Sequence, residues 1–355
     1  MATVYVASTE AFVGKSAVCA GLLDHAQRAG LRTAYMKPVS VSVAHVPGAA
    51  LDEDAAFIRE ALELGAPLDQ MAPVLLTPSA IERVLGGEQH DWGHDVREAF
   101  AAIAQGADLT VLEGTNSWSE GALIGLSADH VAAMLDAKVL LVTRYRTTLA
   151  VDAILAVRRW FGDRLAGVLI NQVPVPQLDF VQERVAPFLE QQGIPVLGLL
   201  PDDTAMAGIQ VSELLEHLGG QVLAGRAGGA NVIEALMVGA MGAEASLSHF
   251  RRRANKAVIT GGDRADLQLA ALETSTSALV LTGNFRPPQQ VLDRADDRKV
   301  PVILVPDDTL TTIERIEALF GHVRFHQPAK LDRFRGLLDA RCDWPRLHAA
   351  LGLAS

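Results

Sequence analysis

The sequence of 355 residues has only two cysteines, Cys19 and Cys342. Two thiols are too few for a disulfide framework or for a metal site made of thiolates. The sequence also has no hydrophobic run long enough to cross a bilayer, and its N-terminus enters a strand-like segment at once, unlike a signal peptide. From these absences we expect a cytoplasmic protein that does not interact with membranes.

Positive charge is scarce as well. The 31 Lys and Arg residues are outnumbered by 42 Asp and Glu residues, which gives a formal net charge of -11. Binding to nucleic acid needs a basic face, so we do not expect nucleic acid as a partner, and a bound nucleotide would have to be held locally. The hydrophobic fraction of 49% and mean hydropathy of +0.21 are typical of a globular protein. The length favours two domains, each with its own core.

The most informative stretch covers residues 3 to 18, TVYVASTEAFVGKSAV. An apolar, strand-like run ends in a loop that closes on Gly14, Lys15 and Ser16, and a helical pattern follows. Backbone N–H groups in such a loop, followed by a helix N-terminus, form a concave site for phosphates. Lys15 would then act as a point charge, and the Ser16 hydroxyl as a ligand of Mg²⁺. We therefore predict a phosphate-binding loop that holds ATP with Mg²⁺.

The loop departs from the usual pattern in its first half. Where the pattern G-x-x-x-x-G-K-[ST] has its first glycine, this sequence has Thr9, preceded by Ser8. A simple glycine turn between strand and helix is the alternative interpretation. The nucleotide interpretation places four further residues beside the phosphates: Thr9, Glu10, Val13 and Ala17.

Three charged residues follow in positions that favour the same site. Lys37 ends a second strand, residues 33 to 41, and ligands bind at that end of a parallel sheet. Glu113 ends the buried strand 108 to 114, a position from which a carboxylate can reach Mg²⁺. Asp54 lies in the first turn of a helix over residues 51 to 64, where it either complements the helix dipole or contributes to the metal site. For Lys37 and Glu113 the alternatives are a solvated lysine and a helix cap.

Strand and helix patterns alternate from there to residue 201, with strands at 138 to 144, 166 to 173 and 195 to 201. This alternation predicts an α/β fold with a parallel sheet and helices on both faces. Asn171 closes one of these strands, where its amide could contact a base or cap a turn. In the polar loop 86 to 95, His90 and His94 have a spacing that could suit a metal, but two glycines and the lack of a third nearby ligand argue against it.

The second half of the sequence is again α/β, with strands expected at 256 to 260, 278 to 282 and 301 to 305. The stretch ITGGDRAD predicts a strand, a two-glycine turn and a helix opened by Asp263. The residues Gly261, Gly262, Asp263 and Arg264 could bind a small anionic metabolite through exposed N–H groups, or could simply cap the helix.

Residues 1 to 203 resemble the dethiobiotin synthetase-like branch of P-loop NTPases, which also supplies the N-terminal domain of long bacterial phosphotransacetylases. The resemblance rests on the stretches STEAFVGKS, MKPV, EDA, VLEG, LINQV and PVLGLLPDD. It implies that Gly14, Lys15 and Ser16 hold the phosphates and Mg²⁺, with Lys37 at the phosphoryl end. It further implies that Asp54 and Glu113 are acids on the metal side, that Asn171 contacts adenine, and that the protein is a homodimer. Ser8 replaces a glycine of the synthetases, and Thr115-Asn116-Ser117 replaces the glycine-rich stretch that shapes their substrate site.

Residues 204 to 320 resemble the DRTGG domain, whose fold is similar to the N-terminal domain of bacterial HPr kinases. The matching stretches are MVGAMGAEASLSHFRR, KAVITGGDRADLQLAAL, ALVLTGNFRPP and VPVILVPDDTLTTIERI. Residues 321 to 355 are expected to form a C-terminal helical tail that packs on a neighbouring domain. No stretch resembles a transacetylase catalytic domain or a glutaminase domain.

Two functions follow from these observations. The first is a nucleotide-binding protein with weak or regulatory NTPase activity, in which Lys15, Lys37 and Glu113 are the catalytic candidates and the second domain senses a ligand. The alternative is an ATP-dependent synthetase that activates a carboxylate or carbamate. A nucleotide-free scaffold would leave Lys15, Ser16 and Glu113 without a role.

Overall fold

The computed structural model describes residues 1–41, 43–46, 49–203, 206, 208–239, 242–321 and 328–353. The chain divides into two compact units. Unit 1 comprises Met1–Asp202 and Phe325–Ser355, and unit 2 comprises Asp203–Arg324. Most of the predicted tail, residues 321 to 355, therefore belongs to the same unit as the N-terminal sheet; residue 321 ends the last helix of unit 2, and residues 322–327 lie outside the described part.

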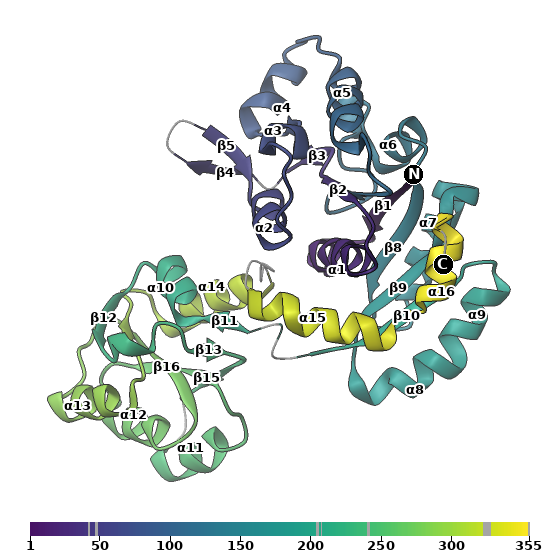
Figure 1. Ribbon diagram of the computed structural model, residues 1–355. Coiled ribbons are helices and arrows are strands. Elements are labelled where there is room, and N and C mark those ends of the chain that lie inside the picture. Colours follow the sequence, from purple (N-terminus) through teal and green to yellow (C-terminus); the bar gives the residue numbers. More distant parts are fainter. Residues whose placement is uncertain are drawn as a thin grey trace. The chain divides into compact units, whose positions relative to one another are not determined.

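Unit 1 is organised around a six-stranded parallel sheet with the order β10-β9-β8-β1-β7-β2 (Figure 1). Its strands are β1 (Ala2–Ser8), β2 (Thr33–Met36), β7 (Leu109–Glu113), β8 (Lys138–Arg144), β9 (Leu165–Val173) and β10 (Val196–Pro201). From β1 the chain moves to one side of the sheet for β2 and β7, and it then crosses to the other side of β1 for β8 to β10. Ligands of open parallel sheets bind at such a reversal of strand order, beside the carboxyl ends of the strands.

Helices cover both faces of this sheet. They are α1 (Lys15–Arg28), α2 (Glu53–Ala61), α3 (Leu68–Met71), α4 (Pro78–Leu85), α5 (Trp92–Ala104), α6 (Ala128–Met134), α7 (Ala150–Phe161), α8 (Leu178–Phe180), α9 (Ala186–Gln191), α15 (Pro328–Arg341) and α16 (Trp344–Leu351). Buried side chains of α5, α6, α7 and α9 form one apolar cluster with Tyr5 and Ala7 of β1. The helices α1, α15 and α16 contact the strands without joining that cluster.

Short strands complete unit 1 beside β2. β3 (Val39–Ser40) pairs in parallel with β6 (Val74–Leu75), and β4 (Val43–Val46) forms an antiparallel hairpin with β5 (Ala49–Asp52). The predicted strand 33 to 41 is therefore divided into β2 and β3, with Lys37 and Pro38 between them. The predicted helix 51 to 64 is shorter, because Asp52 caps α2 by accepting a hydrogen bond from Ala55 N.

Unit 2 contains a five-stranded sheet with the order β12-β17-β16-β15-β14. The strands β14 (Ala235–Val238), β15 (Lys256–Gly261), β16 (Thr276–Thr282) and β17 (Val302–Leu304) are parallel, and β12 (Gln221–Ala224) is antiparallel to β17. Alternate residues of β15 and β16 belong to two apolar clusters. One cluster includes the helices α11 (Ala243–Phe250), α12 (Ala265–Leu272) and α13 (Gln289–Arg298), and the other includes α10 (Val211–Leu218) and α14 (Thr309–Gly321). Both faces are thus buried, as expected for parallel strands.

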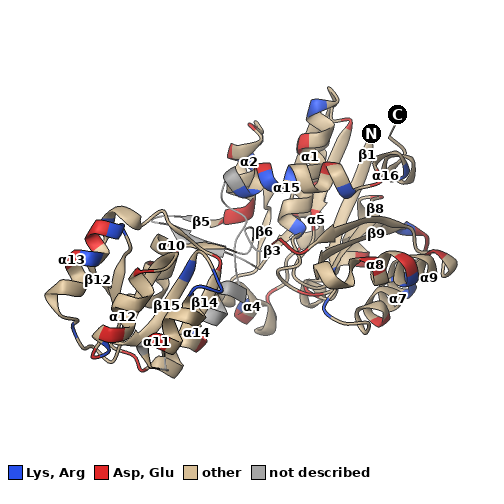
Figure 2. Ribbon diagram, turned by 90° about the horizontal axis from the view of Figure 1, so that it is seen from below, with Lys and Arg blue, Asp and Glu red and all other residues tan. Residues whose placement is uncertain are grey.

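A separate ladder in unit 2 pairs β11 (Ile209–Gln210) with β13 (Val232–Ile233). The parallel strands β14 to β17 follow one another across the large sheet in chain order, so this sheet has no reversal like the one beside β1. Blue and red segments are interspersed over both units in Figure 2. Among the described residues, no helix combines the length and apolar character needed to cross a bilayer.

Candidate functional site

The loop between β1 and α1 requires glycine at position 14 for two reasons. Gly14 has φ +93°, in the left-handed region that favours glycine, and a Cβ atom there would lie 2.5 Å from Nδ2 of Asn171. That amide approaches closely because Asn171 Nδ2 donates a hydrogen bond to the Val13 carbonyl at 2.8 Å. Its Oδ1 atom accepts from Gln172 N at 2.9 Å. Asn171 thus holds the loop in place at the end of β9.

The first half of the loop is tied to neighbouring strand ends. The hydroxyls of Thr9 and Thr143 lie 2.9 Å apart at the end of β8, and Glu10 forms an ion pair of 3.4 Å with Arg144. Ser8, which stands where the synthetases have glycine, donates from Oγ to the carbonyl of Asn116 at 3.0 Å. The departure from the usual pattern therefore has a structural partner, in the loop that follows Glu113.

The first residue of α1, Lys15, is buried, with 7% of its surface exposed. Among the residues that the structure describes, the ammonium group of Lys15 has no hydrogen-bond or ion-pair partner within reach. Burial lowers the pKa of Lys15, and the charge of Glu113 only partly opposes this effect. A largely buried lysine that has no ion-pair contact among the described residues is unfavourable unless a ligand supplies further negative charge.

Glu113 lies at the end of β7 and accepts two hydrogen bonds. Ser16 Oγ donates to its Oε1 at 2.7 Å, and Tyr35 Oη donates to its Oε2 at 2.8 Å. Only 1% of Glu113 is exposed, and burial raises its pKa against the opposing charge of Lys37. The hydrogen bond from Ser16 thus joins two residues of the predicted metal site, Ser16 and Glu113. Tyr35 was not predicted, although the period of two along a strand places it on the same face as Lys37.

Lys37 lies beyond β2 and is as deeply buried as Lys15, but it has two carboxylate partners. Its Nζ atom lies 2.8 Å from Asp52 Oδ2 and 2.6 Å from Asp54 Oδ2. Burial acts to lower the pKa of Lys37, but Glu113, Asp54 and Asp52 outweigh it and hold this pKa above its ordinary value. Asp52 also accepts from Ser40 Oγ at 2.5 Å. The sequence itself showed no sign of the ion pair between Asp52 and Lys37.

The predicted phosphate and metal residues of unit 1 therefore meet at the carboxyl edge of the sheet, beside the strand-order reversal. Lys15, Ser16, Lys37, Asp54 and Glu113 are close enough to influence one another's charge. Asn171 reaches the same edge from β9, below the loop. No group of three or more potential metal-ligating side chains of His, Cys, Asp and Glu was found among the described residues, so any Mg²⁺ site here also needs Ser16 and a ligand's own oxygens.

The loop after Glu113 is closed by its own hydrogen bonds. Thr115 Oγ1 donates to the Ser117 carbonyl at 2.9 Å, and Asn116 N donates to Glu120 Oε2 at 2.9 Å. Together with the bond from Ser8, these contacts hold side chains where a glycine-rich stretch would leave open space.

The glycine turn of unit 2 is tightly packed. A Cβ atom at Gly262 would overlap the carbonyl of Phe285, so only glycine fits there. Both turn carbonyls, of Gly261 and Gly262, accept from Nε2 of the fully buried Gln268 at 2.9 and 3.0 Å. Arg264 lies at the start of α12 and pairs with Asp266 at 3.0 Å. The carbonyls thus face the protein interior, and the prediction of a ligand at this turn remains a prediction.

Comparison with known proteins agrees with this architecture. The family model described as "AAA domain" matches residues 2–210, and the model of the DRTGG domain matches residues 213–319. A phosphate acetyltransferase of Deinococcus radiodurans is 25% identical over 374 residues, which cover 99% of this chain and 51% of that protein. An ATP-dependent dethiobiotin synthetase, BioD, of Pseudomonas aeruginosa is 29% identical over 212 residues, which cover 57% of this chain and 90% of that protein.

A solved structure of the septum site-determining protein MinD of Pyrococcus horikoshii, complexed with Mg-ADP, also aligns with this chain, with 14% identity and a TM-score of 0.34 over 58% of the chain and 83% of that structure. The chain spans about half the length of the phosphate acetyltransferases that it matches. The resemblance inferred from the sequence, a dethiobiotin synthetase-like P-loop domain joined to a DRTGG domain, is confirmed. The chain belongs to the AAA domain family through residues 2–210, and a DRTGG domain follows within the same chain.

Proposed function

We propose that unit 1 binds ATP with Mg²⁺ and that any hydrolysis is slow and serves regulation. The observation that carries this proposal is the contrast between two buried lysines. Lys37 is neutralised by two carboxylates, whereas Lys15 has no partner among the described residues and lies directly after the glycine of the loop. A polyphosphate is the ligand that a buried ammonium group and a helix N-terminus would bind together.

The remaining residues fit the same ligand. Ser16 Oγ and Glu113, which lie 2.7 Å apart, would hold Mg²⁺ directly or through water, with Asp54 on the same side. When bound, the metal would neutralise charge on the phosphates and withdraw electrons from them. Lys37, fixed by Asp52 and Asp54, would place a cation at the outer phosphate. Asn171 stays a candidate for contact with the base, because its amide already reaches the loop.

A second candidate is the reaction of a synthetase. The similarity to ATP-dependent dethiobiotin synthetase covers 90% of that protein, which favours this candidate. The loop of residues 115 to 120 argues against it, since it is closed on itself and on Ser8 where a second substrate would need room. Phosphate release that rises when a diamino or carboxylic acid substrate is added would favour the synthetase. Release that is independent of such substrates would favour regulation.

Substitution of Glu113 by Gln tests the metal part of the proposal. Titration calorimetry of the parent protein with ATP and Mg²⁺ should show binding to one site in each chain. We expect Glu113→Gln to bind ATP with similar affinity in the absence of Mg²⁺ and to lose most of the gain that Mg²⁺ gives the parent, because an amide is a weaker metal ligand. Equal gains from Mg²⁺ in both proteins would contradict a metal role. Thermal unfolding of the variant checks that its fold is intact.

For unit 2 we propose that the DRTGG domain senses a small anionic ligand at Gly261, Gly262, Asp263 and Arg264. Support comes from the guanidinium of Arg264 at the start of α12, which could exchange its exposed partner Asp266 for a carboxylate or phosphate. Calorimetric titrations with nucleotides and acyl phosphates should show a ligand that Arg264→Ala no longer binds. An Arg294→Ala variant, which breaks the exposed pair with Glu273, is the matched control and should bind normally. Equal binding by both variants would exclude this turn.

A further inference from the structure

Of the last two described helices, α15 packs against α1, the helix that begins at the phosphate-binding loop (Figure 1), and α16 contacts α1 through Trp344 and His348, whose rings lie against His25. Residues 328–351, which form these two helices, are called the C-terminal segment here. The close packing of α15 on α1 requires glycine at position 21. A Cβ atom there would lie 2.6 Å from Leu338 Cδ2 and 3.6 Å from Phe334 Cε1. Glycine is unfavourable inside a helix. The close approach of α15 gives a physical reason for its presence in α1.

Ion pairs join the same two helices. The side chain of Asp24 in α1 is 10% exposed; it accepts a hydrogen bond from Arg28 Nε at 2.9 Å and forms an ion pair of 2.6 Å with Arg335. Arg28 in turn contacts Asp339 of α15 at 2.9 Å. The four residues form a chain of alternating charge that links α1 to α15. Partly buried, connected pairs of this kind hold two elements in one register better than isolated surface pairs do.

An aromatic contact anchors α16 to α1. The His25 ring stacks on the Trp344 indole, with ring centroids 3.5 Å apart and planes within 3° of parallel. His25 Nδ1 also lies 3.5 Å from Asp339 Oδ1. The second half of α1 therefore touches both helices of the C-terminal segment.

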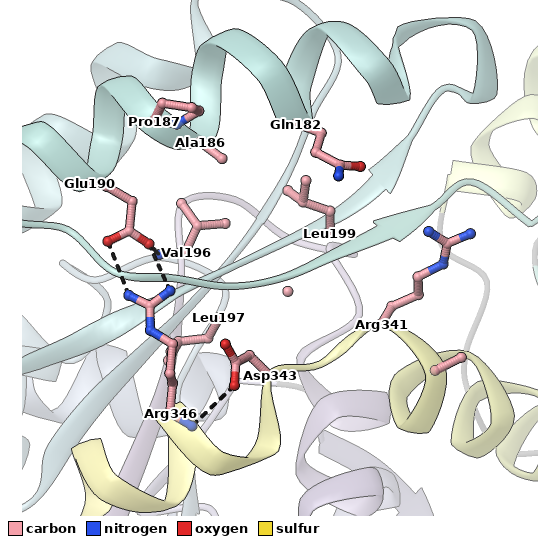
Figure 3. A pocket seen from close by; sticks show the side chains of 12 residues that line it. Gln182, Ala186, Pro187, Glu190, Val196, Leu197, Leu199, Arg341, Asp343 and Arg346 are labelled. Atoms are coloured by element: carbon pink, nitrogen blue, oxygen red, sulfur yellow. Dashed lines mark hydrogen bonds and ion pairs between the residues drawn. The ribbon is translucent and has the colours of Figure 1, made fainter.

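The C-terminal segment has a second anchor at the sheet edge, shown in Figure 3. Arg346 forms an ion pair of 3.0 Å with Glu190, and Asp343 N donates to the Leu197 carbonyl of β10 at 2.8 Å. Gly198 of β10 makes a bridge to Cys342. Between these contacts lies an open cavity of about 730 Å³, lined on one side by α15 and α16. The segment is thus fastened to the sheet independently of α1.

From this geometry, and resting on the proposed nucleotide binding, we propose that docking of the C-terminal segment positions α1 and that this docking is coupled to nucleotide binding at Lys15 and Ser16. The phosphates would bind the first turn of α1, and the C-terminal segment holds its later turns. A helix of 14 residues moves as one body, so the position of its second half sets the position of its first turn. Asp339, Arg335 and Trp344 are then positioning residues, because they act through α1.

The coupling is reciprocal, which makes it measurable from both ends. Amide hydrogen exchange of the full chain, with and without saturating ATP and Mg²⁺, reports on the C-terminal segment. We expect exchange in residues 328–351 to slow several-fold when ATP is bound. Asp339→Asn removes a charge between α1 and α15 while keeping the shape, and Gly21→Ala introduces a methyl group under Leu338. Both variants should speed exchange in residues 328–351 and weaken ATP binding, with about 5-fold or more as the range typical of coupled sites.

Each variant has a matched control in the same unit. Asp136→Asn changes an exposed carboxylate that pairs with Arg164, and Gly336→Ala adds a methyl group where no atom lies within 4 Å. Neither control should speed exchange in residues 328–351 or weaken ATP binding; Gly336→Ala can only slow exchange, because alanine is more favourable than glycine inside a helix. If the parent binds ATP but its C-terminal segment exchanges at the same rate with and without ATP, the coupling is overturned and the proposed function stands. If the parent does not bind ATP, the proposed function fails and the coupling fails with it.

Discussion

Lys37→Met is expected to lower the free energy of unfolding of unit 1 by about 3 to 5 kcal/mol, the loss typical when one member of a buried ion pair is removed. The physical reason is the environment of Asp52. Its side chain is fully buried and its Oδ2 atom lies 2.8 Å from Lys37 Nζ. Without that cation, the bonds that Asp52 keeps among the described residues come from Ser40 and Ala55, and its charge stays buried. Denaturant unfolding followed by circular dichroism measures the change.

The double variant Lys37→Met/Asp52→Asn separates the charge effect from lost packing. It should recover part of the stability, because the buried negative charge is then removed together with its partner. Lys138→Met is the matched control, since Lys138 is exposed and only approaches the Asp163 carbonyl, at 3.4 Å. Its effect should stay within about 0.5 kcal/mol, as is usual for surface substitutions. Equal losses in Lys37→Met and Lys138→Met would show that the ion pair with Asp52 contributes little.

Lys15→Met is expected to abolish stabilisation by ATP without lowering the stability of the protein itself, in contrast to Lys37→Met. In the parent, ATP with Mg²⁺ at a hundredfold excess over its dissociation constant should stabilise the native state by about 2.7 kcal/mol, because the ligand binds only the folded protein. The variant should lose nearly all of this stabilisation. Without ligand it should be at least as stable as the parent, because the Lys15 side chain is mostly buried and has no hydrogen-bond or ion-pair partner among the described residues.

Thermal unfolding with and without ATP and Mg²⁺ measures both effects in the same experiment. Lys138→Met serves again as the control and should keep the full shift. A parent protein whose unfolding temperature does not change with ATP would overturn nucleotide binding. A Lys15→Met protein that is strongly destabilised without ligand would mean that Lys15 has a structural partner, as Lys37 has.

The two lysines also show how far sequence reasoning reached. Both were placed correctly at the carboxyl edge of a parallel sheet, because each follows a strand-like run and a break in the pattern. The two lysines differ in whether carboxylates lie beside the ammonium group and balance its charge. The hairpin and short helix that bring Asp52 and Asp54 to Lys37 are irregular in sequence, and no local pattern shows that a carboxylate fifteen positions later turns back toward it.

Ser8 and Gly21 also show that the sequence does not reveal which distant residues come into contact. Ser8 stands where the synthetases have glycine, and Gly21 lies inside α1, where glycine is unfavourable. The structure gives each a partner that lies far along the chain: Asn116 for Ser8, and Leu338 with Phe334 for Gly21. At both positions the unusual residue makes a tertiary contact. The neighbouring residues in the sequence do not show which distant residue it contacts.

The sequence by itself determined the alternation of strands and helices, the phosphate-binding loop and the acid at the end of β7, because these depend on neighbours within a few residues. The periodicity of buried residues and the residue types of turns are local features, and they show where each strand ends. Because the carboxyl ends of parallel strands meet at one edge of the sheet, these strand ends also predict where the site lies. Only the tertiary structure decided that Lys37 has two carboxylate partners while Lys15 has none among the described residues, that Tyr35 holds Glu113, and that the C-terminal segment returns to α1. Those facts depend on contacts between residues up to about three hundred positions apart, whose pairing is set by how the elements pack and not by the residues that precede or follow them.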